Sequence, residues 1–160
     1  MKKFLCFMLS VMVLAGCFGA SVKAAEATYP MVIHTYTSTE DFASDDWIVA
    51  QKGAYLLNGT SAITRAGSGH INISGITNAT RACDKVRLTL YVEQSSSYAT
   101  GYYTYKQYSY SADNVYQLAK AISNIPVEKG YYYRVFAVHS VQEGSTIETT
   151  DSVTNPISFL

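Results

Sequence analysis

Residues 86–93 read Val86-Arg87-Leu88-Thr89-Leu90-Tyr91-Val92-Glu93, and this stretch decides the fold class. Aliphatic side chains stand at every second position, and polar or aromatic residues fill the positions between them. A period of two places successive side chains on opposite faces of an extended strand. One face of this strand is therefore predicted to be buried and the other to meet solvent, as in an antiparallel sheet.

The segments on both sides of residues 86–93 have a similar composition. Short runs rich in β-branched and aromatic residues are separated by turn residues at intervals of about 8–15 residues, which is typical of a β-sandwich or barrel. The further strands are expected at residues 70–76, 102–110, 131–139, 146–150 and 156–159. Residues 114–123 stay open between strand and helix, because their apolar residues also recur at helical spacing. We predict an all-β domain over residues 55–160, an antiparallel sandwich of about seven strands.

One segment points to a more specific sandwich. Ile125 is followed six residues later by Tyr131, and Tyr133 and Val135 continue in steps of two. This spacing resembles the tyrosine corner of immunoglobulin-like and fibronectin type III domains. The resemblance implies an immunoglobulin-like architecture, in which the Tyr131 ring is buried and its hydroxyl is bonded to the backbone of residues 125–128.

The N-terminus has the features of a secretory signal peptide. Lys2 and Lys3 precede the apolar residues 4–18, and Val22-Lys23-Ala24 supplies the small residues that a signal peptidase reads. The apolar stretch is too short for a membrane span of about 20 residues. We therefore expect residues 1–25 to be removed and the mature protein to be secreted, without a transmembrane helix.

An alternative fate of the N-terminus rests on Cys17. The run Leu14-Ala15-Gly16-Cys17 matches the lipobox of bacterial lipoproteins, in which the cysteine carries the lipid and becomes the first residue. Lipidation by two chains would hold the domain at the outer face of a membrane. The domain faces the outside of the cell in both cases.

Residues 26–54 differ in texture from the rest of the mature chain. Acidic and hydroxyl residues surround isolated aromatic residues, so we expect either an irregular leader that lays Phe42 or Trp47 against the sandwich or a partly disordered tether. Asp41, Asp45 and Asp46 lack the regular spacing of a calcium-binding loop, and we expect them to lie in a solvated acidic loop instead. The histidines of the chain lack zinc-ligand spacing as well. We expect neither a metal nor another cofactor.

Charge narrows the class of partner. Removal of residues 1–25 takes away three of the twelve basic side chains and none of the twelve acidic ones, which leaves a net charge of about −3. A chain with this balance is not expected to bind nucleic acid. The expected partner is therefore a protein or a carbohydrate at the cell surface.

Cys83 is the only cysteine after residue 25. Together with Asp84 and His139 it could supply the nucleophile, orienting group and base of a secreted enzyme. A lone cysteine more often packs in a core as a small hydrophobe, and the chain carries no recognised hydrolase or phosphate-binding motif. We therefore expect a non-enzymatic protein, and an enzyme that uses Cys83 and His139 is the alternative.

A second resemblance covers most of the mature chain. The residues that carry it are Asn72-Ile73-Ser74-Gly75, Cys83-Asp84-Lys85-Val86, Leu90-Tyr91-Val92-Glu93, Gly130-Tyr131-Tyr132-Tyr133-Arg134-Val135, His139-Ser140-Val141, Gly144, Glu148 and Thr154-Asn155. This pattern resembles a family of small secreted proteins of Gram-positive bacteria whose function is unknown. The resemblance implies no catalytic or ligand-binding residue.

The crowding of tyrosines is the strongest functional signal. Eleven of the fourteen tyrosines lie between Tyr91 and Tyr133. Strict alternation sends Tyr103 and Tyr105 to one face of their strand, opposite to Tyr108. Because a sandwich buries one face of each strand, we interpret Tyr103 and Tyr105 as exposed ligand-binding residues of a binding module. Two alternatives stay open: aromatic pairs that only stabilise the sheet, and a structural or immunity-type protein.

Overall fold

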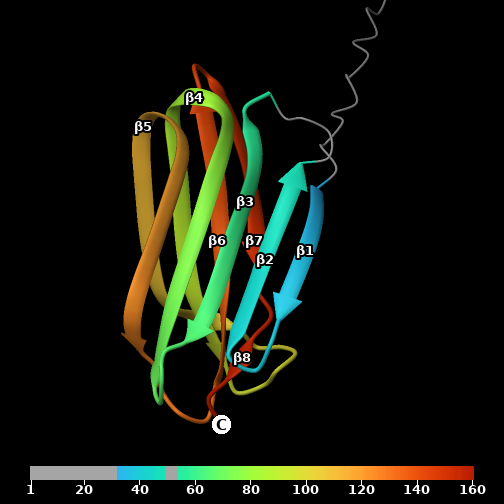
Figure 1. Ribbon diagram of the computed structural model, residues 1–160, viewed down its shortest axis with the longest axis vertical. Helices are drawn as coiled ribbons and strands as arrows, with labels where there is room; N and C mark the ends of the chain where they lie inside the picture. Colours follow the sequence, from blue (N-terminus) through green and yellow to red (C-terminus); the bar gives the residue numbers. More distant parts are fainter. Residues whose placement is uncertain (1–31, 50–53) are drawn as a thin grey trace, which may run out of the picture.

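The computed structural model describes residues 32–49 and 54–160 (Figure 1). The expected signal peptide and Cys17 lie outside the described residues, as does the side chain of Trp47. The strands are β1 (Val32–Ser38), β2 (Phe42–Val49), β3 (Leu56–Arg65), β4 (His70–Ser95), β5 (Tyr103–Pro126), β6 (Tyr132–Glu143), β7 (Thr146–Val153) and β8 (Ile157–Ser158). The prediction of an all-β antiparallel fold is confirmed; of the eight strands in the described part, six lie within residues 55–160, where about seven were expected.

One antiparallel sheet folds over on itself to make two layers. Its strand order is β1-β2-β3-β4-β6-β7, with β5 paired to β4 and β8 paired to β6. The first half of β4 pairs with β3 and the second half with β6, so this 26-residue strand runs through both layers. The first layer contains β1, β2, β3 and residues 70–78, and the second layer contains residues 85–95, β6, β7 and β8.

β5 follows β4 through the same fold. Its first limb, residues 103–113, pairs with the second half of β4, and its second limb, residues 115–126, pairs with the first half. The chain bends between the limbs at Asn114, whose φ of 56° lies in the left-handed region that asparagine tolerates. Residues 114–123 are thus part of a strand. Leu118 and Ile122 both contact the core, since a spacing of four also fits two strand periods.

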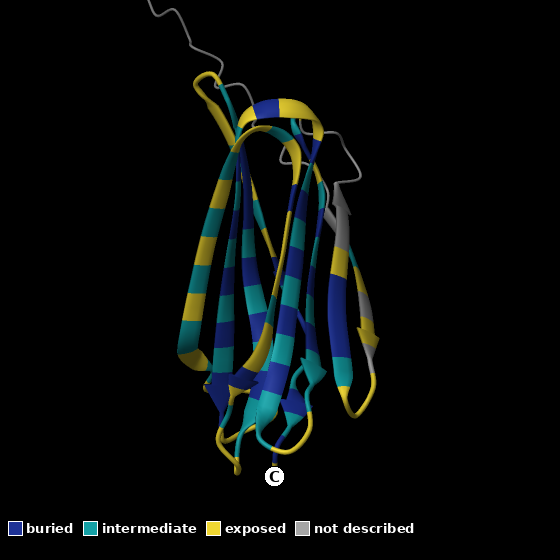
Figure 2. Ribbon diagram, turned by 60° about the vertical axis from the view of Figure 1, so that its left-hand side comes forward, coloured by how far each residue is buried: buried dark blue, intermediate teal, exposed yellow. Residues whose placement is uncertain are grey.

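The core lies between the two layers, and buried positions alternate along the strands (Figure 2). In residues 86–93, the four aliphatic side chains are fully buried, as their period of two predicts. Gly75 in the first layer faces two of them, because a Cβ added at Gly75 would lie 2.7 Å from Leu90 Cδ2 and 3.2 Å from Leu88 Cδ1. A larger residue at Gly75 would therefore press the layers apart.

The irregular leader expected at residues 26–54 is a strand pair where the structure describes it. β1 pairs with β2, and β2 pairs with β3 in the first layer. Asp45, in the acidic stretch, is fully buried; its Oδ2 accepts a 2.7 Å hydrogen bond from the Val153 backbone N–H and lies 3.0 Å from His34 Nδ1. The acidic composition indicated solvent exposure, but partners inside the fold compensate for the burial of this carboxylate. Phe42 is half-buried.

A tyrosine corner is present, but Tyr133 forms it and not Tyr131. The Tyr133 side chain is fully buried; its hydroxyl donates to the Glu128 carbonyl oxygen (3.2 Å) and accepts from the Glu128 N–H (2.9 Å). Burial raises the pKa of Tyr133 to about 12. Tyr131 precedes β6 and is only half-buried. The two tyrosines are one strand period apart and share a face, so the sequence pattern could not choose between them.

Candidate functional site

Aromatic side chains gather on the outer surface of the second layer. Together with one ion pair they form what we call the aromatic face, made of Tyr91, Glu93, Tyr98, Tyr102, Tyr132, Arg134 and Phe136. Tyr91 and Phe136 stand opposite each other on β4 and β6, with ring centroids 5.6 Å apart. Their strand neighbours Leu90 and Val135 are buried, which directs Tyr91 and Phe136 outward.

An ion pair lies among these rings. Glu93 and Arg134 oppose each other on β4 and β6, and Arg134 Nε donates a 2.7 Å hydrogen bond to Glu93 Oε2. The guanidinium carbon lies 4.0 Å from the centre of the Tyr102 ring. Ion pairing and cation–π stacking together hold the guanidinium in one orientation. Among the described residues, only Glu93 accepts a hydrogen bond from this guanidinium.

The loop between β4 and β5 presents Tyr98 to solvent. The Tyr98 side chain is 57% exposed, and its ring meets Tyr132 edge-on, with centroids 5.6 Å apart and planes at 85°. Ser95 Oγ donates a 2.6 Å hydrogen bond to the Thr100 carbonyl, and the Tyr102 hydroxyl donates a 2.9 Å bond to the Tyr98 carbonyl. These bonds within the loop hold the exposed ring in place.

The central phenol of the aromatic face is that of Tyr102, and it is neutral. Burial raises the pKa of Tyr102 to about 12, although the Arg134 guanidinium acts in the opposite direction. A neutral phenol both donates and accepts hydrogen bonds. The face thus combines apolar rings, a neutral hydroxyl and an oriented guanidinium, and tyrosine, phenylalanine and arginine are the residue types enriched in binding interfaces.

A bulge in β5 overturns the expected split of its tyrosines. The register of β5 against β4 shifts between Val92 and Glu93, where Tyr105 is the extra residue. Strict alternation placed Tyr103 and Tyr105 opposite to Tyr108. The extra residue instead brings all three to the side of β5 that faces the core.

The two tyrosines that we singled out for ligand binding therefore have different surroundings. Tyr105 is half-buried, packs edge-on against Tyr133 at a centroid distance of 5.9 Å, and donates its hydroxyl to the Pro126 carbonyl (3.1 Å). The expectation of an exposed Tyr105 ring is wrong. Tyr103 is 53% exposed and accepts a hydrogen bond from Gln94 Nε2, but it stands apart from the aromatic face.

Tyr98, Tyr102 and Arg134 are not among the binding residues expected from the sequence. The alternation in residues 86–93 and 132–138 does predict that Glu93 and Arg134 point outward on their own strands. Only the register between β4 and β6 brings these two residues opposite each other. Tyr98 carries no periodic signal, and Tyr102, expected at the start of a strand over residues 102–110, lies in the loop before β5.

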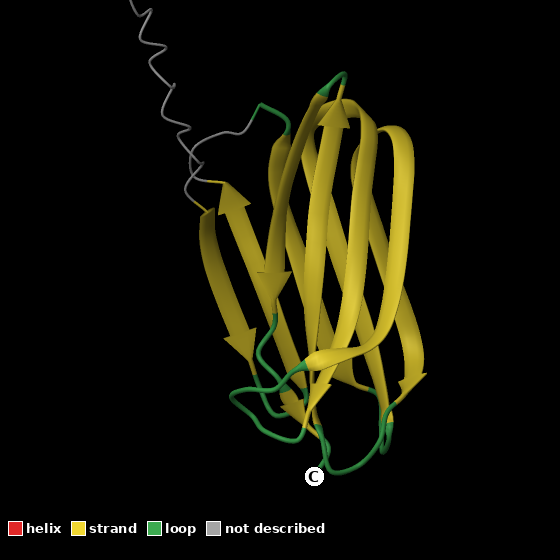
Figure 3. Cartoon of the chain, turned by 180° about the vertical axis from the view of Figure 1, so that it is seen from behind, coloured by secondary structure: helices red, strands yellow, loops and turns green. Residues whose placement is uncertain are grey.

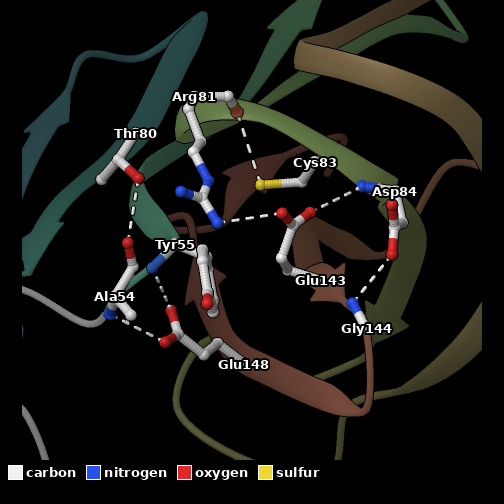
Figure 4. A network of polar contacts seen from close by, with 9 residues as sticks. All are labelled: Ala54, Tyr55, Thr80, Arg81, Cys83, Asp84, Glu143, Gly144 and Glu148. Carbon is white, nitrogen blue, oxygen red and sulfur yellow. Dashed lines mark hydrogen bonds and ion pairs between the residues drawn. The ribbon is translucent and has the colours of Figure 1, made fainter.

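The residues of the alternative enzyme site are not brought together. The register pairs His139 with Leu88, whereas Cys83 lies five residues earlier on β4, about 17 Å away at the usual rise of a strand. Cys83 is 1% exposed, and its Sγ donates to the Arg81 carbonyl oxygen at 3.4 Å (Figure 4). Burial raises the pKa of the Cys83 thiol, which is the opposite of what nucleophilic attack requires.

His139 belongs to a buried polar chain that crosses the core. One ring nitrogen lies 2.9 Å from Thr77 Oγ1 in the first layer, and the other lies 3.0 Å from Ser152 Oγ in the second layer. Ser152 in turn donates to Ser61 Oγ at 2.8 Å. Burial lowers the pKa of His139 to about 4. The neutral imidazole therefore links the two layers instead of serving a surface site.

Asp84, the third residue of that alternative, has structural partners. Its carboxylate accepts a 2.7 Å hydrogen bond from the Gly144 N–H (Figure 4). The neighbouring Glu143 carboxylate accepts from the Asp84 N–H at 3.1 Å and from Arg81 Nη2 at 2.9 Å. These contacts tie the bend of β4 to the turn between β6 and β7.

The start of β3 is hydrogen-bonded to other strands at the same end of the molecule. The Glu148 carboxylate on β7 accepts hydrogen bonds from the backbone N–H groups of Ala54 (2.8 Å) and Tyr55 (3.1 Å) (Figure 4), and also from that of Leu56 (2.6 Å). Thr80 adds a 2.8 Å hydrogen bond from its N–H to the Tyr55 carbonyl. Three charge-assisted bonds give Glu148 a structural role in joining the layers.

The acidic residues of the N-terminal strands do not converge. Asp41 pairs with Arg65, whereas Asp45 is buried and bonded to β7. Within residues 32–49 and 54–160, no group of three or more histidine, cysteine, aspartate or glutamate side chains could hold a metal ion. That part of the chain also contains no helix long and apolar enough to cross a membrane.

A comparison with protein families is informative for most of the chain. Residues 22–157 match the pattern of a family of unknown function, DUF6147. The chain belongs to the DUF6147 family. The match begins before β1 and ends at the start of β8, so the DUF6147 domain includes the β1–β2 pair together with both layers. The expectation of a family of unknown function is confirmed. No match was found among curated proteins.

Proposed function

We propose that this protein is an exported, non-catalytic module that binds a protein or carbohydrate at the cell surface through the aromatic face. The observation that carries the proposal is the arrangement of Tyr98, Tyr102 and Arg134: the exposed Tyr98 is hydrogen-bonded through its carbonyl to Tyr102, on which the ion-paired Arg134 guanidinium stacks. The signal-peptide pattern of residues 1–25 supports export. The alternative is lipidation at Cys17, which would hold the domain at the outer face of the membrane.

The arrangement suits binding for two physical reasons. Tyrosine and arginine are residue types on which the binding energy of interfaces concentrates. A tyrosine ring has few rotatable bonds, and Arg134 is already oriented by Glu93 and Tyr102. Little conformational entropy is therefore lost when a partner covers these side chains.

A role in stabilising the sheet explains only some of the residues in the aromatic face. Tyr91 and Phe136 contact each other across paired strands, as aromatic residues that stabilise a sheet do. Tyr98 instead lies in a loop outside the strands and keeps 57% of its side chain exposed. Its position brings little stability to the sheet, and binding is the function that fits it.

The experiment measures binding of the fluorescently labelled protein to intact cells of the organism that encodes it. We expect Tyr98→Ala to weaken saturable binding at least about tenfold, which is about 1.4 kcal/mol. Tyr116→Ala is the matched control, because Tyr116 is 65% exposed on the second limb of β5, away from the aromatic face. The control should bind as the unmodified protein does.

Two treatments of the cells identify the class of partner. Protease digestion removes binding to a surface protein, and periodate oxidation of vicinal diols removes binding to a carbohydrate. Absence of saturable binding by the unmodified protein, or equal binding by the Tyr98→Ala variant, would contradict the proposal.

A further inference from the structure

The first limb of β5 is an open strand edge. Residues 103–113 pair with β4 on one side, and no strand within residues 32–49 or 54–160 pairs with the other side. Figure 3 shows β5 at the rim of the folded sheet, where its two limbs border the two layers. An unpaired edge presents backbone N–H and C=O groups that can pair with a further strand.

The centre of this limb has none of the features that usually block such pairing. The six residues from Gln107 to Ala112 include no charged residue, glycine or proline. Their register against β4 is unbroken. The bulge at Tyr105 comes before this stretch, and the left-handed φ of Asn114 comes after it. A regular edge therefore remains between the two irregularities.

The sequence of this edge is complementary to itself. When two copies are placed antiparallel with Ser109 opposite Ser109, Tyr108 opposes Tyr110 and Gln107 opposes Ser111. The two tyrosines face the core side and are half-buried, whereas Gln107, Ser109 and Ser111 are exposed on the other side. Each pair thus joins aromatic with aromatic or polar with polar, and such cross-strand pairs stabilise sheets.

Charge at the ends of the stretch favours the same antiparallel arrangement. Lys106 lies at one end and Asp113 at the other, and Asp113 keeps 64% of its side chain exposed although it pairs with Lys85 at 3.2 Å. Antiparallel pairing places Lys106 opposite Ala112 and Asp113 opposite Tyr105, so it brings no like charges together at either end. A parallel arrangement in the same alignment would bring like charges together, which is unfavourable.

We infer that two copies of this chain pair antiparallel through the first limb of β5, about a two-fold axis at Ser109. The second layers of both copies then form one continuous sheet, and the two aromatic faces lie on the same side of it. Pairing along about six residues buries less surface than a standard stable interface, so the dimer is weak and depends on concentration. Two aromatic faces on one side increase the avidity for a partner that repeats on a surface.

Sedimentation analysis of the purified, processed protein over a range of concentrations tests the dimer. We expect a mass that rises toward twice that of the monomer, and a Ser109→Lys variant that stays monomeric because the two introduced lysines repel each other at the axis. Ser123→Lys is the matched control on the second limb of β5, where Ser123 is also exposed. The control should dimerise as the unmodified protein does.

Two further measurements test the axis itself. An equimolar mixture of Ser109→Lys and Ser109→Asp variants should restore the dimer, because opposite charges then meet at the axis. Ser109→Cys should form a disulfide-linked dimer under mild oxidation, since residues opposite in an antiparallel pair lie within disulfide reach, and Ser123→Cys should not. The native Cys83 is buried and does not compete.

The outcomes of these experiments distinguish a dimer through β5 from a monomer and from a dimer through another surface. A monomer at all concentrations without Ser109→Cys cross-linking would overturn the inference, and so would a dimer that Ser109→Lys leaves unchanged. If Ser109→Lys fails to fold by circular dichroism, the cross-linking comparison decides. The inference stands apart from the proposed function, since none of these measurements depends on a bound partner.

Discussion

Tyr133 fastens the turn between β5 and β6 from inside the core, where its hydroxyl exchanges two hydrogen bonds with the backbone of Glu128. Tyr133→Phe keeps the ring and removes both bonds. We expect the free energy of unfolding to fall by about 1–2 kcal/mol. Urea denaturation followed by circular dichroism measures this change.

Tyr131→Phe is the control for that measurement. Tyr131 is half-buried, with its ring 6.5 Å from that of Tyr133. Its substitution should change the free energy of unfolding by less than about 0.5 kcal/mol. A larger loss in Tyr131→Phe than in Tyr133→Phe would show that the corner has been assigned to the wrong tyrosine.

His139 makes the stability of the domain depend on pH. Its pKa is lowered to about 4 in the folded state, below the value of about 6.5 in an unfolded chain. The unfolded state therefore binds a proton first as the pH falls. The neutral His139 therefore makes its full contribution to stability above about pH 6.5. This contribution, on the order of 3 kcal/mol, is lost as the pH falls from about 6.5 to about 4.

Thermal or urea unfolding at several pH values between 4 and 7 tests the role of His139. His139→Gln should be less stable at neutral pH but should show a flatter dependence on pH in this window. His70→Gln is the control, because His70 lies half-buried at the start of β4, outside the polar chain. Equal slopes for His139→Gln and the unmodified protein would refute the assignment.

At the scale of elements, β4 and β5 determine the architecture. β4 is long enough to belong to both layers, and β5 follows it through the bend at Asn114. The period of two predicts the inward and outward faces of residues 70–76 and 86–93 correctly, although these two stretches belong to one strand and the phase changes between them. In β5 one bulge at Tyr105 reverses the faces of the residues before it. A local irregularity in pairing therefore decides on which face of the strand each tyrosine lies.

The whole molecule is closed by contacts between residues far apart in the chain. Asp45 of β2 bonds to Val153 of β7, and Glu148 of β7 bonds to residues 54–56. The β1–β2 pair is thus fastened to the second layer and not left as a leader. The family match over residues 22–157 agrees with this wider domain.

Export of this domain is a prediction, and cleavage and lipidation give different outcomes. If residues 1–25 are cleaved, the mature protein should begin at Ala25 or Glu26 and should appear in the medium. If Cys17 is lipidated, Cys17→Ala should release the protein from the membrane fraction. N-terminal sequencing and fractionation measure the two outcomes. A protein retained inside the cell with residues 1–25 intact would refute both.

The sequence by itself determined the all-β class, the faces of residues 70–76 and 86–93, the exclusion of a calcium-loop motif and the expectation of export. These features depend on local periodicity and composition, which are readable along one strand. The tertiary structure decided that β1 and β2 join the sheet, that Tyr133 and not Tyr131 forms the corner, and that Glu93 meets Arg134 beneath Tyr102. Each of these features depends on the register between strands or on a bulge. A one-residue shift in pairing changes which side chains meet, although the two-residue alternation along each strand stays the same.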